Sequence, residues 1–143
     1  MIGYFLKNTL SDFGSVSRAV CEHDADYILK DIVEYLKITR SGEATENISQ
    51  SVDTQILSLD TIVSMNMWRI TPKIFDFLRK GFPEFLEAHS TEQKSEYLFA
   101  SVIGIAMQEN KITVQIIKSK DAWFGVRYPQ DKARVEDNIA RMV

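Results

Sequence analysis

Hydrophobic and polar residues alternate through the first quarter of the chain, and a period of two is typical of β-strands. The alternation predicts a short strand over residues 2–6 and two longer strands over residues 15–22 and 27–36. A polar segment, His-Asp-Ala-Asp at residues 23–26, separates the two longer strands. The pattern therefore predicts a β-hairpin near the start of the chain.

The pattern changes in the middle of the chain. Residues 39–58 are rich in Ser, Thr and Glu and contain no aromatic residue, which predicts a long surface loop. Residues 61–70 are predicted to form another strand, and Thr-Pro at residues 71–72 is a favourable start for a helix. We expect this helix to end where Gly81 and Pro83 interrupt it.

The second half of the chain combines helical and extended patterns. Ser-Thr-Glu-Gln at residues 90–93 matches a capping box, and apolar residues then recur every three or four positions, so a second helix should run to about residue 108. Residues 111–117 and 123–128 are predicted strands, and Pro129 opens a last helix. Three residues of that helix are expected to face inward: Val135, Ile139 and Met142. This order of elements predicts an α/β fold with a mixed β-sheet and packed helices.

Composition narrows the class of protein. The chain has 143 residues, 45% of them hydrophobic, which suits a single domain over residues 1–143. Its net charge of −3 provides no attraction for a phosphate backbone, so nucleic acid is not an expected partner. There is no apolar run of about 20 residues for a membrane span and no basic start typical of a signal peptide. With one cysteine, Cys21, we expect a cytoplasmic protein without a disulfide framework.

The predicted strand over residues 61–70 carries the first candidate binding surface. Alternation would place Ser64, Asn66 and Trp68 on one face. A hydroxyl, an amide and a flat indole suit a polyol ligand. The alternative is that this face is simply solvated or covered by the long loop.

Glu34 is the second candidate, because alternation places its carboxylate in an apolar row with Ile28 and Ile32. An ionised carboxylate in such a row needs a partner. That partner could be the hydroxyls of a ligand, or Lys30 or an arginine in a structural ion pair. Lys37 could neutralise a phosphate or be an ordinary solvated lysine.

The common motifs of nucleotide and metal enzymes are missing from the sequence. It contains no G-x-G, no G-x-x-x-x-G-K and no H-E-x-x-H, and the six glycines lie too far apart to form a phosphate-binding loop. Cys21 is more consistent with a small core residue than with a nucleophile. Composition and spacing alone leave the function undecided.

A set of longer motifs gives information on function that composition and spacing do not. In chain order they are Gly3-Tyr4-Phe5, Gly14-Ser15-Val16-Ser17-Arg18, Val33-Glu34, Ser64-Met65-Asn66-Met67-Trp68 before Thr71-Pro72, Lys94-Ser95-Glu96-Tyr97, and Trp123-Phe124-Gly125-Val126 before Asp131-Lys132. Together they resemble the C-terminal part of bacterial sugar-phosphate nucleotidyltransferases, over nearly the whole chain.

The resemblance implies a reaction in which a sugar 1-phosphate oxygen attacks the α-phosphorus of a nucleoside triphosphate and releases pyrophosphate. In that superfamily the N-terminal half binds the nucleotide, the C-terminal half supplies the sugar-phosphate pocket, and Mg²⁺ is expected for the complete enzyme. The chain alone is therefore expected to be inactive, with a sugar 1-phosphate and an N-terminal half as partners. The alternatives are a non-catalytic sugar-phosphate-binding module, or an oligomerisation module that pairs its open sheet edge with another copy.

The resemblance also implies roles for individual residues. Glu34 matches the carboxylate that accepts from sugar hydroxyls, Ser64 and Asn66 lie on the strand lining the sugar pocket, and Glu96 begins the helix that closes it. Lys37 matches the lysine that meets the sugar phosphate.

Two departures accompany these matches. Gly125 stands where many members have a metal-binding aspartate, so no metal ligand is expected there. Arg69 stands where closer relatives tend to have glycine; it could block the pocket or bind an anion, and its strand face, opposite Ser64 and Asn66, favours a surface role.

Overall fold

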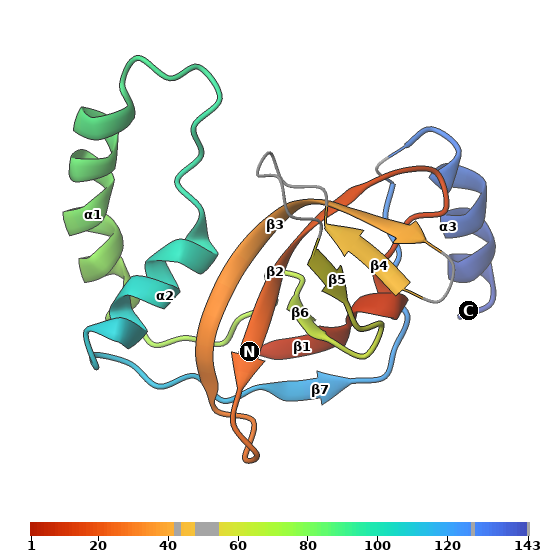
Figure 1. Ribbon diagram of the computed structural model, residues 1–143, viewed down its shortest axis with the longest axis horizontal. Helices are drawn as coiled ribbons and strands as arrows, with labels where there is room; N and C mark the ends of the chain where they lie inside the picture. Colours follow the sequence, from red (N-terminus) through yellow and green to blue (C-terminus); the bar gives the residue numbers. More distant parts are fainter. Residues whose placement is uncertain (42–43, 48–54, 127, 143) are drawn as a thin grey trace.

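The computed structural model describes residues 1–41, 44–47, 55–126 and 128–142, which form a mixed α/β fold (Figure 1). Seven strands make one sheet: β1 (Ile2–Phe5), β2 (Val16–His23), β3 (Leu29–Ser41), β4 (Ala44–Asn47), β5 (Gln55–Leu57), β6 (Ile62–Ser64) and β7 (Ile117–Ser119). The helices are α1 (Ile74–His89), α2 (Phe99–Gln108) and α3 (Asp131–Ala140), and Leu6–Asn8 forms a short 3-10 turn.

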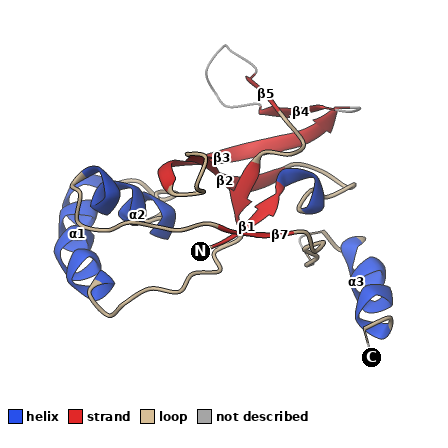
Figure 2. Ribbon diagram, turned by 90° about the horizontal axis from the view of Figure 1, so that it is seen from below, coloured by secondary structure: helices blue, strands red, loops and turns tan. Residues whose placement is uncertain are grey.

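The sheet is mixed, which confirms the predicted fold class. Its strand order is β5-β4-β3-β2-β6-β1-β7. The β1–β7 pair is parallel, and every other neighbouring pair is antiparallel. Figure 2 shows α1 and α2 at one end of the sheet and α3 at the opposite end.

The predicted hairpin is confirmed as β2 and β3. Its turn is held by Asp24, whose carboxylate accepts from the N–H of Asp26 at 3.1 Å and of Ile28 at 2.9 Å. Tyr27 completes the turn at φ 59°, in the left-handed region. β3 continues beyond the predicted end of the hairpin as far as Ser41.

Each face of the sheet buries its own hydrophobic cluster. On the face next to α1 and α2, the fully buried Ile103 of α2 packs with Ile32 and Cys21. Burying one such side chain stabilises the fold by about 1.5–3 kcal/mol. On the other face, Ile38 and Leu57 join a second cluster, which explains why the chain on both sides of the undescribed residues is extended.

The expected loop over residues 39–58 is therefore wrong where the structure describes it. β3 reaches into this segment, and β4 and β5 lie within it, while residues 42–43 and 48–54 lie outside the described part. Polar composition misled the prediction because backbone pairing holds β4 between β3 and β5, and this pairing does not require apolar side chains.

The predicted strand over residues 61–70 is too long. β6 ends at Ser64, because Asn66 adopts φ 58° and breaks the alternation. The chain beyond it still contacts β1, since the Met67 carbonyl accepts from the N–H of Ile2 at 3.0 Å. The sorting of residues 64–68 into two strand faces is therefore lost.

Helix α1 passes through both of its predicted interruptions and reaches His89. Gly81 leaves room for Tyr97, whose hydroxyl would clash with a Cβ on this residue. Pro83 is flanked by Phe82 and Phe85, whose rings lie 5.5 and 5.1 Å from that of Tyr97. This aromatic packing offsets the backbone hydrogen bond that a proline removes.

Helix α2 begins at Phe99, later than its predicted start, although its end at Gln108 is as expected. Residues 90–98, here called the connector, precede it without forming a helix. Glu92, which was predicted to belong to a capping box, instead contacts His89, with Glu92 Oε2 3.0 Å from His89 Nδ1. It closes a turn at the end of α1.

The C-terminal segment differs from expectation in two respects. No strand forms at described positions of 123–128; the N–H of Trp123 donates to the Asn8 carbonyl at 3.0 Å, which ties this segment to the start of the chain. In α3, Ile139 is 51% exposed and Met142, just after the helix, is 72% exposed, so the predicted inward orientation is wrong for these two residues, whereas Val135 is half-buried. Instead, the buried Asp131 anchors α3 by accepting from the N–H of Tyr128 at 2.8 Å.

Candidate functional site

Glu34 and Ser64 lie in one row across the sheet. Glu34 of β3 pairs with Ala19 of β2, and Ala19 pairs with Ser64 of β6. Directly opposed residues of antiparallel strands project to the same face. This is the face of Ile32 and Cys21, next to α2, so the structure brings two of the predicted residues to one face of the sheet, where Glu34 is half-buried and Ser64 is buried.

The Glu34 carboxylate is partly withdrawn from water. Burial raises the pKa of Glu34; the charge of Arg18 lowers it and the charge of Glu96 raises it again. Lys30, its suggested ion-pair partner, pairs with Asp24 at 2.7 Å instead. Glu34 and Glu96 therefore act on one another, and a ligand hydroxyl donating to either would stabilise its charge.

Ser64, Asn66 and Trp68 remain linked although the strand ends between them. The N–H of Asn66 donates to Ser64 Oγ at 3.1 Å, and Trp68 Nε1–H donates to Asn66 Oδ1 at 3.5 Å. The Trp68 ring meets Phe99 edge-on, with ring centres 5.8 Å apart. Hydrogen bonds rather than strand alternation hold this trio together.

Lys37 and Glu96 are less closely joined to this group. Lys37 is exposed on β3, beyond an irregularity in the pairing with β2 that separates it from the Glu34 row. Glu96 lies in the connector, before the helix it was expected to begin. The structure therefore does not bring Lys37 to the other candidate residues.

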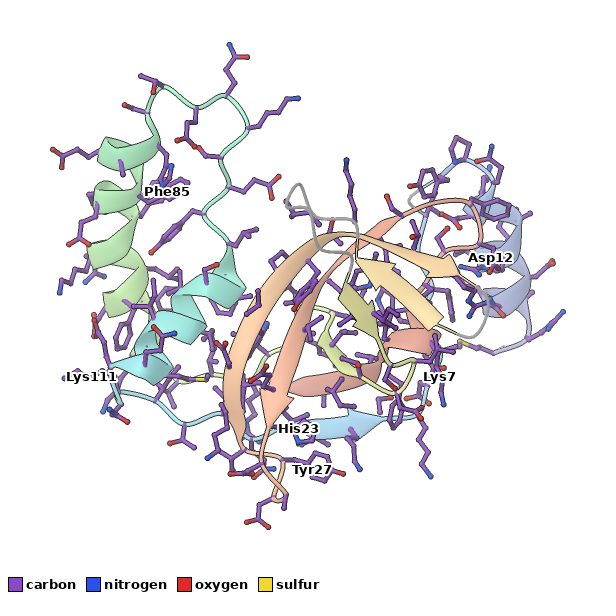
Figure 3. All side chains as sticks on the ribbon, in the orientation of Figure 1. Lys7, Asp12, His23, Tyr27, Phe85 and Lys111 are labelled. Atoms are coloured by element: carbon purple, nitrogen blue, oxygen red, sulfur yellow. The ribbon has the colours of Figure 1, made fainter. Side chains whose placement is uncertain are left out.

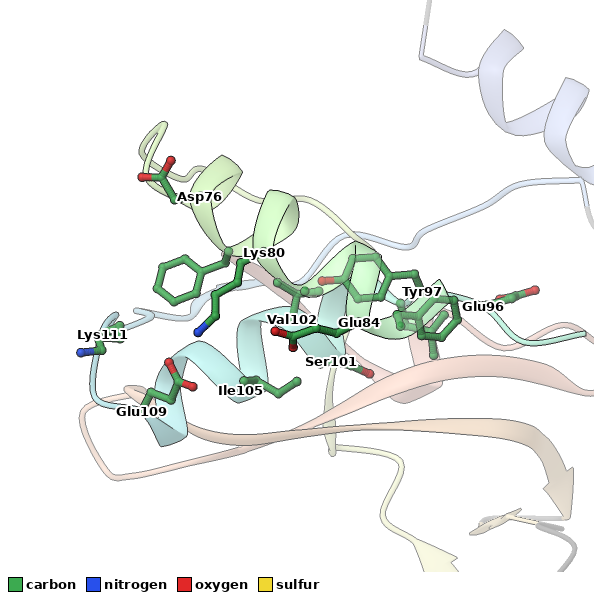
Figure 4. Close-up of a pocket in the computed structure, with 14 residues that line it drawn as sticks. Asp76, Lys80, Glu84, Glu96, Tyr97, Ser101, Val102, Ile105, Glu109 and Lys111 are labelled. Carbon is green, nitrogen blue, oxygen red and sulfur yellow. The ribbon is translucent and has the colours of Figure 1, made fainter. Parts of the chain in front are cut away.

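Glu96 also borders a cleft of about 570 Å³ between α1, the connector and α2. In Figure 4, Glu84 and Glu109 lie along this cleft, whereas the Glu96 carboxylate points outward. Figure 3 shows Phe85 on the side of α1 that faces the connector. We call this space, with four acidic residues and two lysines in its lining, the acidic cleft.

Tyr97 is the residue that the sequence motifs placed beside Glu96 without assigning it a role. Its ring contacts Phe82 and Phe85, and burial, followed by the charge of Glu84, raises the pKa of its phenol. Gly81 was the available signal, because a glycine inside a helix often marks a close approach.

Cys21 is buried and does not supply a nucleophile to the site. Burial raises the pKa of the Cys21 thiol to about 12, so it remains protonated at neutral pH and suits the core role expected for it. Among the residues that the structure describes, no three His, Cys, Asp or Glu side chains gather as ligands of one ion. Gly125, which stands where the motif resemblance leads one to expect an aspartate, has no side chain that could hold Mg²⁺.

No protein-family model and no curated protein matches this chain. The resemblance seen in the motifs therefore stays an expectation. None of the described helices is both long and apolar enough to cross a membrane.

Proposed function

We propose that this chain is the sugar-phosphate-binding half of a nucleotidyltransferase, and that a site made by Glu34, Asn66, Trp68 and the buried Ser64 receives a sugar 1-phosphate. The observation that carries the proposal is the half-buried Glu34 carboxylate, in register with Ser64 and facing α2. A carboxylate in this setting accepts strongly from hydroxyls, which a sugar has in abundance.

Each remaining residue has a distinct part in binding. Asn66 is exposed, and its amide nitrogen can donate to a ring hydroxyl while its Oδ1 accepts from Trp68. The indole offers an apolar surface to the sugar's C–H groups. Glu96 adds a second acceptor near Glu34. Lys37 remains a proposed phosphate contact only through the motif resemblance.

The acceptor phosphate oxygen, once bound, would attack a triphosphate held by another polypeptide half. No glycine-rich loop for such a triphosphate exists in the sequence. The proposal is therefore that the chain binds and orients the acceptor, and that Mg²⁺ and the nucleotide belong to the complete enzyme.

The oligomerisation alternative has less support. It depends on an open sheet edge, but the outermost described strands, β5 and β7, have only three residues each. Very short edge strands are among the devices that prevent edge-to-edge pairing. A sugar-phosphate-binding module without turnover is consistent with the same site and differs only in whether a catalytic partner exists.

Calorimetric titration with a panel of sugar 1-phosphates, including those of glucose, galactose, mannose and N-acetylglucosamine, tests the site. At least one should bind, and Glu34→Ala should weaken it by about tenfold or more, because a hydrogen bond to a charged group contributes about 1.5–3 kcal/mol. Glu22→Ala is the matched control, since Glu22 is an exposed carboxylate on neighbouring β2. Equal binding by wild type and Glu34→Ala would contradict the assignment.

A second measurement tests the division of labour. The purified chain mixed with a nucleoside triphosphate and the bound sugar 1-phosphate should release no pyrophosphate. Steady release by this chain alone would overturn the proposal that it lacks the nucleotide-binding half.

A further inference from the structure

A second cleft, of about 530 Å³, lies at the start of α1. It is bordered by the start of α1, by residues 68–71 after β6, by Ile103 of α2 and by the segment that leads to β7. Its volume is in the range of small-molecule sites. No residue of the proposed sugar site lines it except Trp68.

Charge distinguishes this cleft from its neighbour. Arg69, Lys73 and Lys111 line it, and no Asp or Glu is among the described lining residues. None of the three forms an ion pair with a described carboxylate. Three cationic side chains around one cleft, with no ion-pair partner among the described residues, create a positive potential in a chain whose net charge is −3. We call it the basic cleft.

The rest of the lining is mainly apolar. Trp68 and Phe77 supply aromatic surface, and Ile74, Ile103 and Val114 supply aliphatic surface. Gln115 is committed elsewhere, because its Nε2 donates to the Asp26 carbonyl at 2.9 Å. The cleft thus combines a hydrophobic wall with positive charge at its border.

The start of α1 is not the source of the anion preference. The first N–H groups of the helix are occupied: those of Ile74 and Phe75 donate to the carbonyls of Thr71 and Pro72 at 3.2 and 3.0 Å. Recognition in the basic cleft therefore depends on the three side-chain charges.

We propose that the basic cleft binds a small organic phosphate with an aromatic body, such as a nucleoside monophosphate. The aromatic part packs against Trp68 and Phe77, and the phosphate is neutralised by Arg69 with Lys73 and Lys111. Arginine suits this role because its guanidinium donates two parallel hydrogen bonds to phosphate. Arg69, the departure from the family pattern, becomes a binding residue of a site distinct from the sugar surface.

Trp68 connects the two sites. One part of its side chain lines the basic cleft, while its Nε1–H donates to Asn66 on the sugar surface. A ligand in the basic cleft should therefore change Trp68 fluorescence. The Trp123→Phe background removes the only other tryptophan, so the signal reports Trp68 alone.

The test is titration with adenosine monophosphate, with adenosine and inorganic phosphate as partial ligands. The nucleotide should bind at least about tenfold more tightly than adenosine or inorganic phosphate, because the cleft contacts both its aromatic base and its phosphate. It should also change Trp68 emission in Trp123→Phe. Binding no tighter than that of inorganic phosphate, or no change in emission, would overturn the proposal.

A charge-matched pair of double variants locates the site. Arg69→Gln with Lys73→Gln should weaken the nucleotide by about tenfold or more. Arg79→Gln with Lys80→Gln removes the same charges from α1 outside the basic cleft and should leave affinity within about twofold. Circular dichroism establishes that both are folded. Equal losses of affinity in the two double variants would contradict the site. If either double variant does not fold, the Trp123→Phe protein decides: Trp68 emission that does not change with the nucleotide would contradict the site.

The two proposals share Trp68, but their outcomes can be told apart. Glu34→Ala should leave nucleotide binding unchanged, and a saturating sugar 1-phosphate should not displace the nucleotide. Displacement by the sugar phosphate would instead indicate that one site binds both, and would overturn the assignment of a separate cleft.

Discussion

The acidic and basic clefts are close in size and share two residues, yet they present opposite charges. Their volumes are about 570 and 530 Å³, and Phe77 and Lys111 line both. The acidic cleft has Asp76, Glu84, Glu96 and Glu109 against two lysines, whereas the basic cleft has three cations and no described acid. Size therefore does not separate them, and charge decides which class of ligand each admits.

The comparison also shows how one helix can separate two environments. Asp76, Lys80 and Glu84 of α1 line the acidic cleft, whereas Ile74 at the start of α1 and Lys73 just before it line the basic one. Asp76, Lys80 and Glu84 are four positions apart and therefore lie on one face of α1, whereas Arg69 and Lys111 of the basic cleft come from segments outside this helix. Neither set is visible from overall composition.

Removal of the Phe77 ring, which lines both clefts, should have the largest effect, and this effect is on stability. Phe77→Ala deletes a half-buried ring that lines both clefts and packs against the core. We expect a loss of about 2 kcal/mol in the free energy of unfolding, measured by urea denaturation. Phe75→Ala is the control, because Phe75 on the same helix is 60% exposed and should cost no more than about 0.5 kcal/mol. Similar losses of unfolding free energy in both variants would show that the packing of Phe77 does not stabilise the fold.

Reversal of the shared charge should have a smaller effect, on binding. In Figure 4 the Lys111 ammonium turns away from the acidic cleft, so we expect its charge to act mainly in the basic one. Lys111→Glu should weaken adenosine monophosphate about fivefold by calorimetry, the scale of one exposed charge contact. Lys80→Glu reverses a lysine that lines only the acidic cleft and should change affinity by less than about twofold. Equal effects would mean that the two clefts are not electrically distinct.

The smallest effect should be the pH dependence that Glu34 of β3 gives to the free energy of unfolding. Burial, opposed by Arg18 and reinforced by Glu96, raises the pKa of Glu34 above its ordinary value of 4.5. The folded chain therefore holds this proton more tightly than the unfolded chain, and stability falls as pH rises from 4.5 through the raised pKa.

Glu34→Gln should remove that dependence. Relative to the variant, the free energy of unfolding of the wild type should fall by a few tenths of a kcal/mol between about pH 4 and about pH 7. The effect is small because solvent screens the charge of a half-exposed group. Urea denaturation at both pH values gives the difference. A wild-type stability that rises against Glu34→Gln over this range would contradict the direction of the pKa shift.

The candidate sugar site was partly predictable. Alternation placed Glu34 beside Ile32, and the pairing of β2 with β3 keeps both on the face next to α2. The link between Ser64 and Trp68 was also anticipated, but for a different reason, since Asn66 leaves the strand and hydrogen bonds maintain the group. The basic cleft was not predictable, because Arg69 and Lys111 are far apart in sequence and only α1 and α2 bring them together.

Local pattern by itself determined β1, the β2–β3 hairpin, the end of α2 and the mixed α/β class, because adjacent side chains decide strand and helix periods. Tertiary structure decided the rest. Pairing of β4 with β3 and β5 made strands of a polar segment, and packing of Tyr97 on α1 kept a helix intact across Gly81 and Pro83. Backbone ladders and long-range contacts supply free energies as large as local propensities, so they override the sequence signal wherever that signal is weak.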